Sequence, residues 1–93
     1  MVVGLLTVEL HVSGSHSLKE KRMVVRRVKD RLKKFNVSVS EIEHQDLWQR
    51  AGIAVVTVST DQAHADRELA ACADEIERVE PGLVIRTEIE FLT

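Results

Sequence analysis

The 93-residue sequence has few of the residues that define the commonest classes of small protein. It contains a single cysteine, Cys72, so no internal disulfide can form and nothing indicates an oxidising compartment. It has one proline, four glycines, no internal repeat and no low-complexity linker. Because so short a chain cannot supply two separate cores, we expect one domain covering residues 1–93.

The N-terminal stretch does not have the pattern of a secretory or membrane-spanning segment. The residues MVVGLLTVELHV have no basic leader and include Glu9, so we expect neither a signal peptide nor a membrane span there. We therefore expect a cytoplasmic protein without a membrane partner.

Aromatic residues make up only 3% of the chain, and none lies in the apolar segments 2–12 and 52–60. This argues against a sheet that stacks RNA bases on aromatics of its central strands. The turn Ser13-Gly14-Ser15-His16 replaces the Cys-x-x-Cys of metal-carrying domains, and the histidines show no ligand spacing. We expect no metal and no cofactor.

The sequence contains no catalytic constellation. Ser15, His16 and Ser17 are adjacent, but adjacency in sequence is not the geometry of a triad. Glu41 and Glu43 fall on the same side of one predicted strand, as a carboxylate pair or as the solvated side of an edge strand. We predict that the protein is not an enzyme.

The hydrophobic pattern predicts an alternation of strands and helices. Apolar residues at helical spacing predict two helices, and Ser17 with Glu20 forms a capping box before the first. The predicted elements are strand 2–12, helix 18–35, strand 37–44, strand 52–60, helix 61–80 and strand 83–92. This order predicts an α+β ferredoxin-like βαββαβ sandwich, with a four-stranded antiparallel sheet and two helices on one face.

The strongest physical feature is the charge of the first helix. Residues 19–34 hold nine of the 13 basic residues and only two acidic ones, a net charge of +7 in a chain of −2. Such a split is typical of a face that meets a polyanion, or of a charge-rich surface on which the two helices complement each other. Spacings of three and four residues form a ladder able to follow successive phosphates. The predicted nucleic-acid-binding residues are Lys19, Lys21, Arg22, Arg26, Lys29 and Lys33.

Lys21 is an exception within that set, because its angular position falls near the middle of the apolar stripe. Either its side chain extends past the start of the helix to solvent, or its ammonium enters the Ser13–Ser17 loop and completes an anion site.

The sheet face without helices offers a second candidate surface. Apolar residues left uncovered there predict a symmetric dimer, because monomers rarely expose large apolar patches. The predicted interface residues are Val3 and Leu5, Ile53 and Val55 or their neighbours, and Trp48 as an anchor. Folding of Trp48 over one end of the core is an equal alternative.

One further pattern comprises Ser17-Leu18-Lys19-Glu20-Lys21-Arg22, Asn36-Val37-Ser38-Val39, Glu41, Asp46, Trp48 and the apolar third strand. With these segments the sequence resembles the bacterial YlxP-like family. The resemblance covers nearly the whole chain and implies a ferredoxin-like fold. Genes of that family lie beside those for translation initiation and ribosome-binding factors, which implies a place near ribosome or RNA biology. The resemblance supplies no catalytic residues.

Two functional hypotheses follow from the sequence. The first is a non-enzymatic bacterial accessory protein that docks its basic helix on RNA or a ribosomal subunit. The alternative is a homodimeric module that binds a protein or a small anion.

Overall fold

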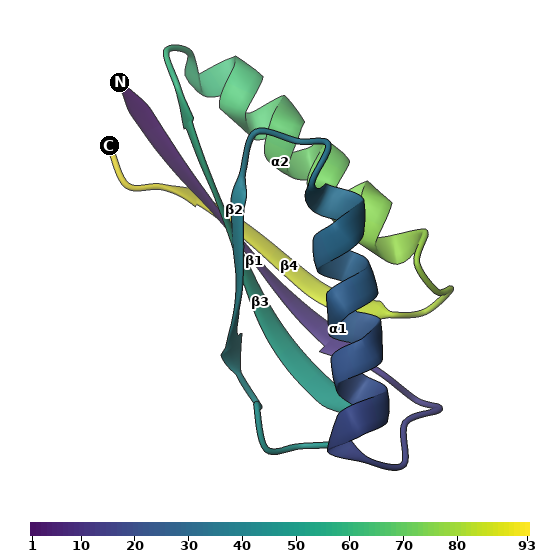
Figure 1. Cartoon of the computed structure of the whole chain (residues 1–93). Helices are drawn as coiled ribbons and strands as arrows, with labels where there is room; N and C mark the ends of the chain where they lie inside the picture. The colour runs from purple at the N-terminus through teal and green to yellow at the C-terminus, as the bar shows by residue number, and fades with distance from the viewer.

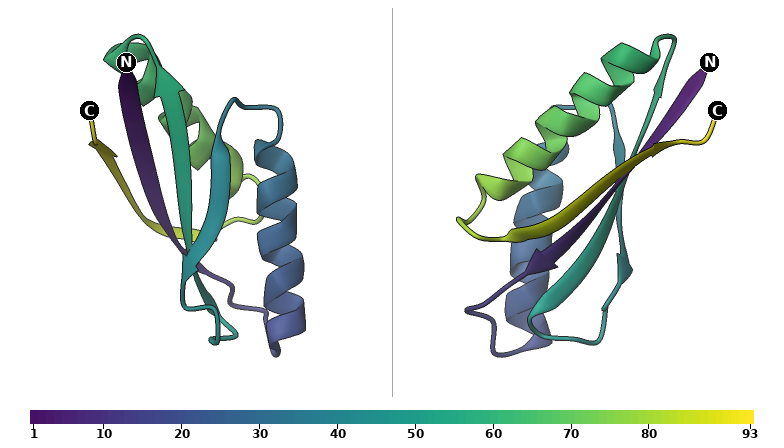
Figure 2. Two further views of the ribbon diagram at one scale, coloured as in Figure 1. Left: turned by 60° about the vertical axis from the view of Figure 1, so that its left-hand side comes forward. Right: turned by 180° about the vertical axis from the view of Figure 1, so that it is seen from behind.

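The computed structural model describes residues 1–93 as four strands and two helices (Figure 1). In chain order they are β1 (Val2–His11), α1 (Leu18–Leu32), β2 (Ser38–Glu43), β3 (Arg50–Ser59), α2 (Gln62–Glu77) and β4 (Val84–Phe91). All strand pairs are antiparallel, in the order β2-β3-β1-β4. Both helices cover the same face of the sheet, and the other face is open (Figure 2). The predicted ferredoxin-like fold is confirmed.

The alternation of β1 separates the two faces of the sheet. Leu6, Val8 and Leu10 point to the helices and are fully buried. Val3 and Leu5 point to the open face, where they lie opposite Val58 and Val56 of β3. The register therefore decides which residues of β3 are available to a partner.

Ile53 and Val55 lie on the helix side of β3, so their prediction as interface residues is wrong. Both are fully buried in the core. They pair with Val8 and Leu6, which face the helices, so their own side chains must point the same way. Their neighbours Ala54, Val56 and Val58 lie on the open face instead.

Side-chain caps fix where the helices begin. The Ser17 side chain accepts a hydrogen bond from the Glu20 amide at 3.1 Å, as the capping box predicts. The Glu20 carboxylate accepts from the His16 amide at 2.6 Å, one residue before the expected donor. Asp61 caps α2 by accepting from the His64 amide. Helix α1 ends at Leu32, three residues before the predicted end, and no helix is long and apolar enough to cross a membrane.

The loop between β2 and β3 lies beside the start of α1 in all views (Figures 1 and 2). Three hydrogen bonds hold it there. Lys21 Nζ donates to the His44 carbonyl at 2.6 Å, Gln49 Nε2 donates to the Ser15 carbonyl at 3.2 Å, and the Val12 amide donates to the Gln49 carbonyl at 2.8 Å. His44 has a φ of 60°, uncommon for a residue with a side chain, so these contacts fix a specific loop conformation.

Candidate functional site

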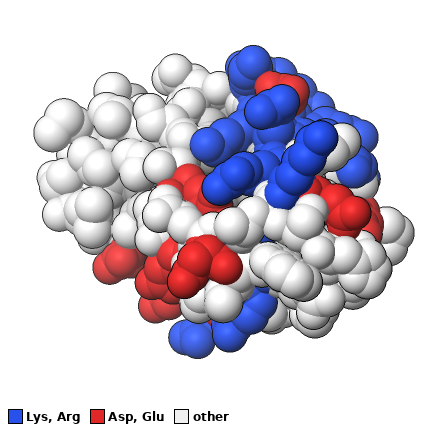
Figure 3. Space-filling view, turned by 60° about the horizontal axis from the view of Figure 1, so that its bottom comes forward, with Lys and Arg blue, Asp and Glu red and all other residues white.

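Five basic residues, four in α1 and one at its C-terminal cap, form an exposed strip that is here called the basic stripe. Its members are Lys19, Arg22, Arg26, Lys29 and Lys33, all exposed. At 100° per residue they fall within a sector of about 80°, and at 1.5 Å per residue they extend for about 21 Å. Figure 3 shows Lys and Arg side chains gathered densely on one part of the surface, with few carboxylates among them.

Basic residues on the opposite flank of α1 and just after its end are held by α2 and its C-terminal turn. Arg31 and Lys34 each lie 3.0 Å from Oε1 of Glu75, and Arg27 donates to the Val79 carbonyl at 2.9 Å. Hydrogen bonds from Lys34 and then Arg31 lower the pKa of Glu75 to about 2, against the opposing effect of burial. The carboxylate therefore stays ionised at neutral pH and holds these cations against α2.

The basic stripe itself is left almost free of such partners. No carboxylate lies within ion-pair distance of Lys19, Arg22, Arg26 or Lys29. Lys33 contacts only Asp30, at 3.1 Å, and both side chains are exposed, so that pair contributes little. Glu75 of α2 partly offsets the charge on its own side of α1, and the stripe keeps its full positive charge.

A groove of about 270 Å³ runs between the stripe and the edge strand β2. Its lining residues are Arg22, Val25, Arg26, Lys29 and Glu41. The two guanidinium groups and one ammonium supply donors along one wall. Glu41 is the only acidic lining residue, and its charge already has a partner inside the protein. A phosphate backbone therefore meets a groove with a net positive charge.

That partner is Lys21, which does not contribute to the basic stripe. Its side chain is fully buried, and Nζ lies 3.1 Å from Oε2 of Glu41 and 2.6 Å from the His44 carbonyl. Oε2 of Glu41 is buried and accepts no well-aligned hydrogen bond, so the Lys21 charge is its partner. Lys21 neither extends to solvent nor enters the Ser13–Ser17 loop. Its prediction as a nucleic-acid-binding residue is wrong, because a buried, paired ammonium cannot reach a phosphate.

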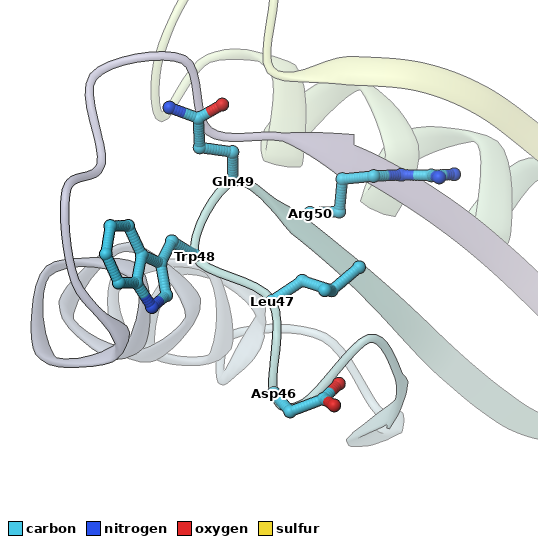
Figure 4. Close-up of a pocket in the computed structure, with 5 residues that line it drawn as sticks. All are labelled: Asp46, Leu47, Trp48, Gln49 and Arg50. Atoms are coloured by element: carbon cyan, nitrogen blue, oxygen red, sulfur yellow. The ribbon is translucent and has the colours of Figure 1, made fainter.

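Trp48 lies in the loop beside the start of the basic stripe, not on the open sheet face. Its side chain points away from the side chains of Asp46, Leu47 and Arg50 (Figure 4). Arg50, two residues after Trp48, pairs with His11 at the end of β1. His11 lies six residues from Leu5, a distance of about 20 Å along the strand. Trp48 and Leu5 therefore cannot form one compact patch. The residue remains 55% exposed, so it does not seal the core either.

The open sheet face has an apolar cluster at one end, bordered by Glu90 of β4 beside Leu5, and a charged cluster at the other end. Val3, Leu5, Val56 and Val58 form the apolar end, and Val58 is 57% exposed. At the other end Glu9 contacts Arg50, and Nε2 of His44 lies 3.4 Å from Glu9 Oε1.

The carboxylates and the thiol show no arrangement of reacting groups. A register shift between Glu41 and Glu43 turns Glu41 towards Lys21 while Glu43 stays exposed, so the predicted same-side pair is wrong. Burial raises the pKa of Cys72 to about 11, which keeps its thiol protonated and weakly nucleophilic. No group of three or more His, Cys, Asp or Glu side chains is placed to hold a metal ion.

These features define an α+β ferredoxin-like protein with a positively charged helix on its covered side. The chain belongs to the family described as "Protein of unknown function (DUF503)", whose model matches residues 3–89. It is 41% identical over 69 residues to "Uncharacterized protein YlxP" of Bacillus subtilis (strain 168), which covers 73% of this chain and 75% of that protein. The resemblance seen in the sequence is thereby confirmed.

Two solved structures share the fold at low sequence identity. The de novo designed protein Foldit4 has a TM-score of 0.56 and 14% identity, covering 99% of this chain and 96% of its own. SnoaB, a cofactor-independent oxygenase from Streptomyces nogalater, has a TM-score of 0.56 and 16% identity, covering 100% and 93%. At such low identity these similarities show the fold alone.

Proposed function

We propose that this chain is a non-enzymatic bacterial accessory protein that binds structured RNA, including that of the ribosome, through the basic stripe of α1. The observation that carries the proposal is that Lys19, Arg22, Arg26 and Lys29 have no acidic partner in the protein. In a chain of net charge −2, an unneutralised strip of this length favours a polyanion at that place.

The residues of the stripe itself are suited to contact with phosphates, and the sheet offers no surface for stacking bases. The two central strands carry no aromatic residue on which a base could stack. Arg and Lys on neighbouring turns of a helix match a charged backbone, and guanidinium groups bind phosphate oxygens through paired hydrogen bonds. This kind of binding depends on shape and charge, as in the recognition of double-stranded RNA.

The test is a binding titration at several salt concentrations. Small ribosomal subunits and an unrelated structured RNA are titrated with the protein between low and physiological salt. We expect binding to both at low salt, with log K falling linearly with log salt at a slope of about −3 to −5 for four or five neutralised phosphates. Binding that survives only to the ribosomal subunit at higher salt would identify a specific site. Absence of binding at low salt would refute the proposal.

A second candidate function is weak homodimerisation through the open sheet face, with a second copy of this chain as the partner. Val3, Leu5, Val56 and Val58 present apolar surface that two sheets can pack together at a separation of about 10 Å. The whole open face, with its charged end included, has four strands of about eight residues and offers at most on the order of 500 Å² per copy. The total of about 1,000 Å² only reaches the lower limit for a specific interface, so the dimer should dissociate on dilution.

Sedimentation velocity at increasing protein concentration tests this dimer. We expect the wild type to shift from monomer to dimer, and Val56→Asp to stay monomeric because it places a charge in the apolar end. Met23→Asp is the control, since Met23 is 56% exposed on α1, away from the sheet. A wild type that sediments as a monomer at every concentration would rule the dimer out.

A further inference from the structure

The indole of Trp48 is an apolar group that the fold leaves on the surface. Trp48 is the only tryptophan of the chain, and it is 55% exposed. The neighbouring Leu47 is 42% exposed, and neither residue belongs to the core. An aromatic side chain of this size usually buries its area, so one held in solvent is a candidate contact residue.

The loop that carries Trp48 is fixed by the protein interior. Lys21, fully buried in the first turns of α1, donates to the His44 carbonyl on one side of the loop. Gln49 donates to the Ser15 carbonyl and accepts from the Val12 amide on the other side. Because both ends are held, the indole is presented at low entropic cost to a ligand.

These same contacts place the loop that carries the indole beside the start of α1, the end at which the basic stripe begins. The loop is bonded to Ser15, just before α1, and to Lys21, between Lys19 and Arg22. The residues at this end of the stripe are exposed and have no acidic partner. An aromatic face next to a row of cations is the combination that holds an unstacked base while its backbone is bound electrostatically.

We propose that Trp48 stacks on an unpaired nucleotide of a structured RNA whose neighbouring phosphates lie along the basic stripe. The inference rests on the proposed function and deepens it, because it names the RNA feature recognised. Phosphate contacts fix the position of the RNA but carry no selectivity, whereas a stacking residue favours a bulged or looped base over a continuous duplex. Stacking is tolerant of base identity, so the selectivity is for an unpaired base of any kind.

The experiment uses two RNA hairpins that differ only by one bulged nucleotide. Because Trp48 is the only tryptophan and the chain has no tyrosine, the fluorescence excited at 295 nm comes from Trp48 alone. We expect the bulged hairpin to quench this emission and the fully paired hairpin to quench it much less. With labelled hairpins, Trp48→Ala should weaken binding of the bulged hairpin about 5- to 150-fold and that of the paired hairpin little.

Two further variants separate stacking from general damage. Trp48→Phe should retain most of the affinity because it keeps an aromatic face. Leu47→Ala should bind both hairpins like the wild type, because it removes exposed apolar area without a π system. The salt slope of Trp48→Ala should equal that of the wild type, since no phosphate contact is lost.

The outcomes distinguish failure of this inference from failure of the proposed function. If both hairpins bind with a steep salt dependence and Trp48→Ala changes neither affinity, the stacking role is wrong and the proposed RNA binding by the basic stripe is still supported. If neither hairpin binds at low salt, the proposed function is wrong and the inference falls with it. Emission that shifts with protein concentration in the absence of RNA, and not on adding either hairpin, would place Trp48 in a contact between two copies and overturn the stacking role.

Discussion

Replacing Lys21 with methionine is expected to lower the free energy of unfolding by roughly 3 kcal/mol. The ammonium is fully buried and is the charge partner of Glu41, whose side chain is only 15% exposed. Without it the protein must hold a nearly buried carboxylate with no counter-charge and leave the His44 carbonyl without its donor. The estimate is at the low end for broken buried pairs because Glu41 retains some contact with water.

The measurement is urea unfolding at neutral pH, followed by circular dichroism. We expect the midpoint to fall with an unchanged m-value, and the Tm to drop by roughly 12–24 °C for a domain of this size. The double variant Lys21→Met with Glu41→Leu is the control, because apolar groups in place of both charges remove the unpaired carboxylate. It should regain most of the lost stability. A loss below about 1 kcal/mol in the single variant would contradict the structural role given to Lys21.

The sequence predicted most of the fold because local signals agreed with the tertiary structure. The 3.6-residue period identified both helices, and Ser17 and Asp61 mark where they begin. The end of α1 was placed three residues too late, since Phe35 continues the apolar stripe beyond the helix and packs on the core from the following turn. A hydrophobic period reports burial, and burial does not require helical backbone.

The orientation of β3 could not be predicted, because this strand is apolar on both faces. Ile53, Val55, Ala54 and Val56 give the same pattern whichever way the strand is turned. The pairing with β1 determines which face of β3 points to the helices, since Ile53 lies opposite the buried Val8. The same pairing separates Trp48 from the apolar end of the open face.

The candidate site could be predicted only in part, because the residues that pair with its cations are distant in sequence. The sequence placed Lys21 correctly in the apolar stripe, but its partner Glu41 is on β2 and the carbonyl that it binds is in the next loop. Likewise, only the packing of α2 against α1 shows that Glu75 holds Arg31 and Lys34. The basic residues without such a buried or interhelical partner form the basic stripe, which is a smaller set than all the basic residues of the helix.

The basic stripe leads to the largest expected effect on function. Replacing Arg22, Arg26 and Lys29 together with alanine is expected to weaken binding to structured RNA roughly 100- to 1,000-fold at about 0.1 M salt. Each of the three lines the groove beside β2, and none has an acidic partner in the protein. Removing three phosphate contacts should also make the log–log salt dependence shallower by about three units.

The slope of log K against log salt distinguishes direct phosphate contacts from a general effect of net charge on RNA binding. A matched triple variant provides the control. Replacing Arg67, Arg78 and Arg86 together with alanine removes the same amount of charge from α2, its C-terminal cap and β4. Arg78 and Arg86 are about 70% exposed, and Glu75 keeps Arg31 and Lys34 when Arg78 is lost. This control should keep the wild-type slope and lose affinity only slightly, because the three arginines lie outside the basic stripe and salt screens exposed charges that contact no phosphate. Equal losses in the two triple variants, both folded by circular dichroism, would mean that RNA senses only the net charge and that α1 is not the binding surface.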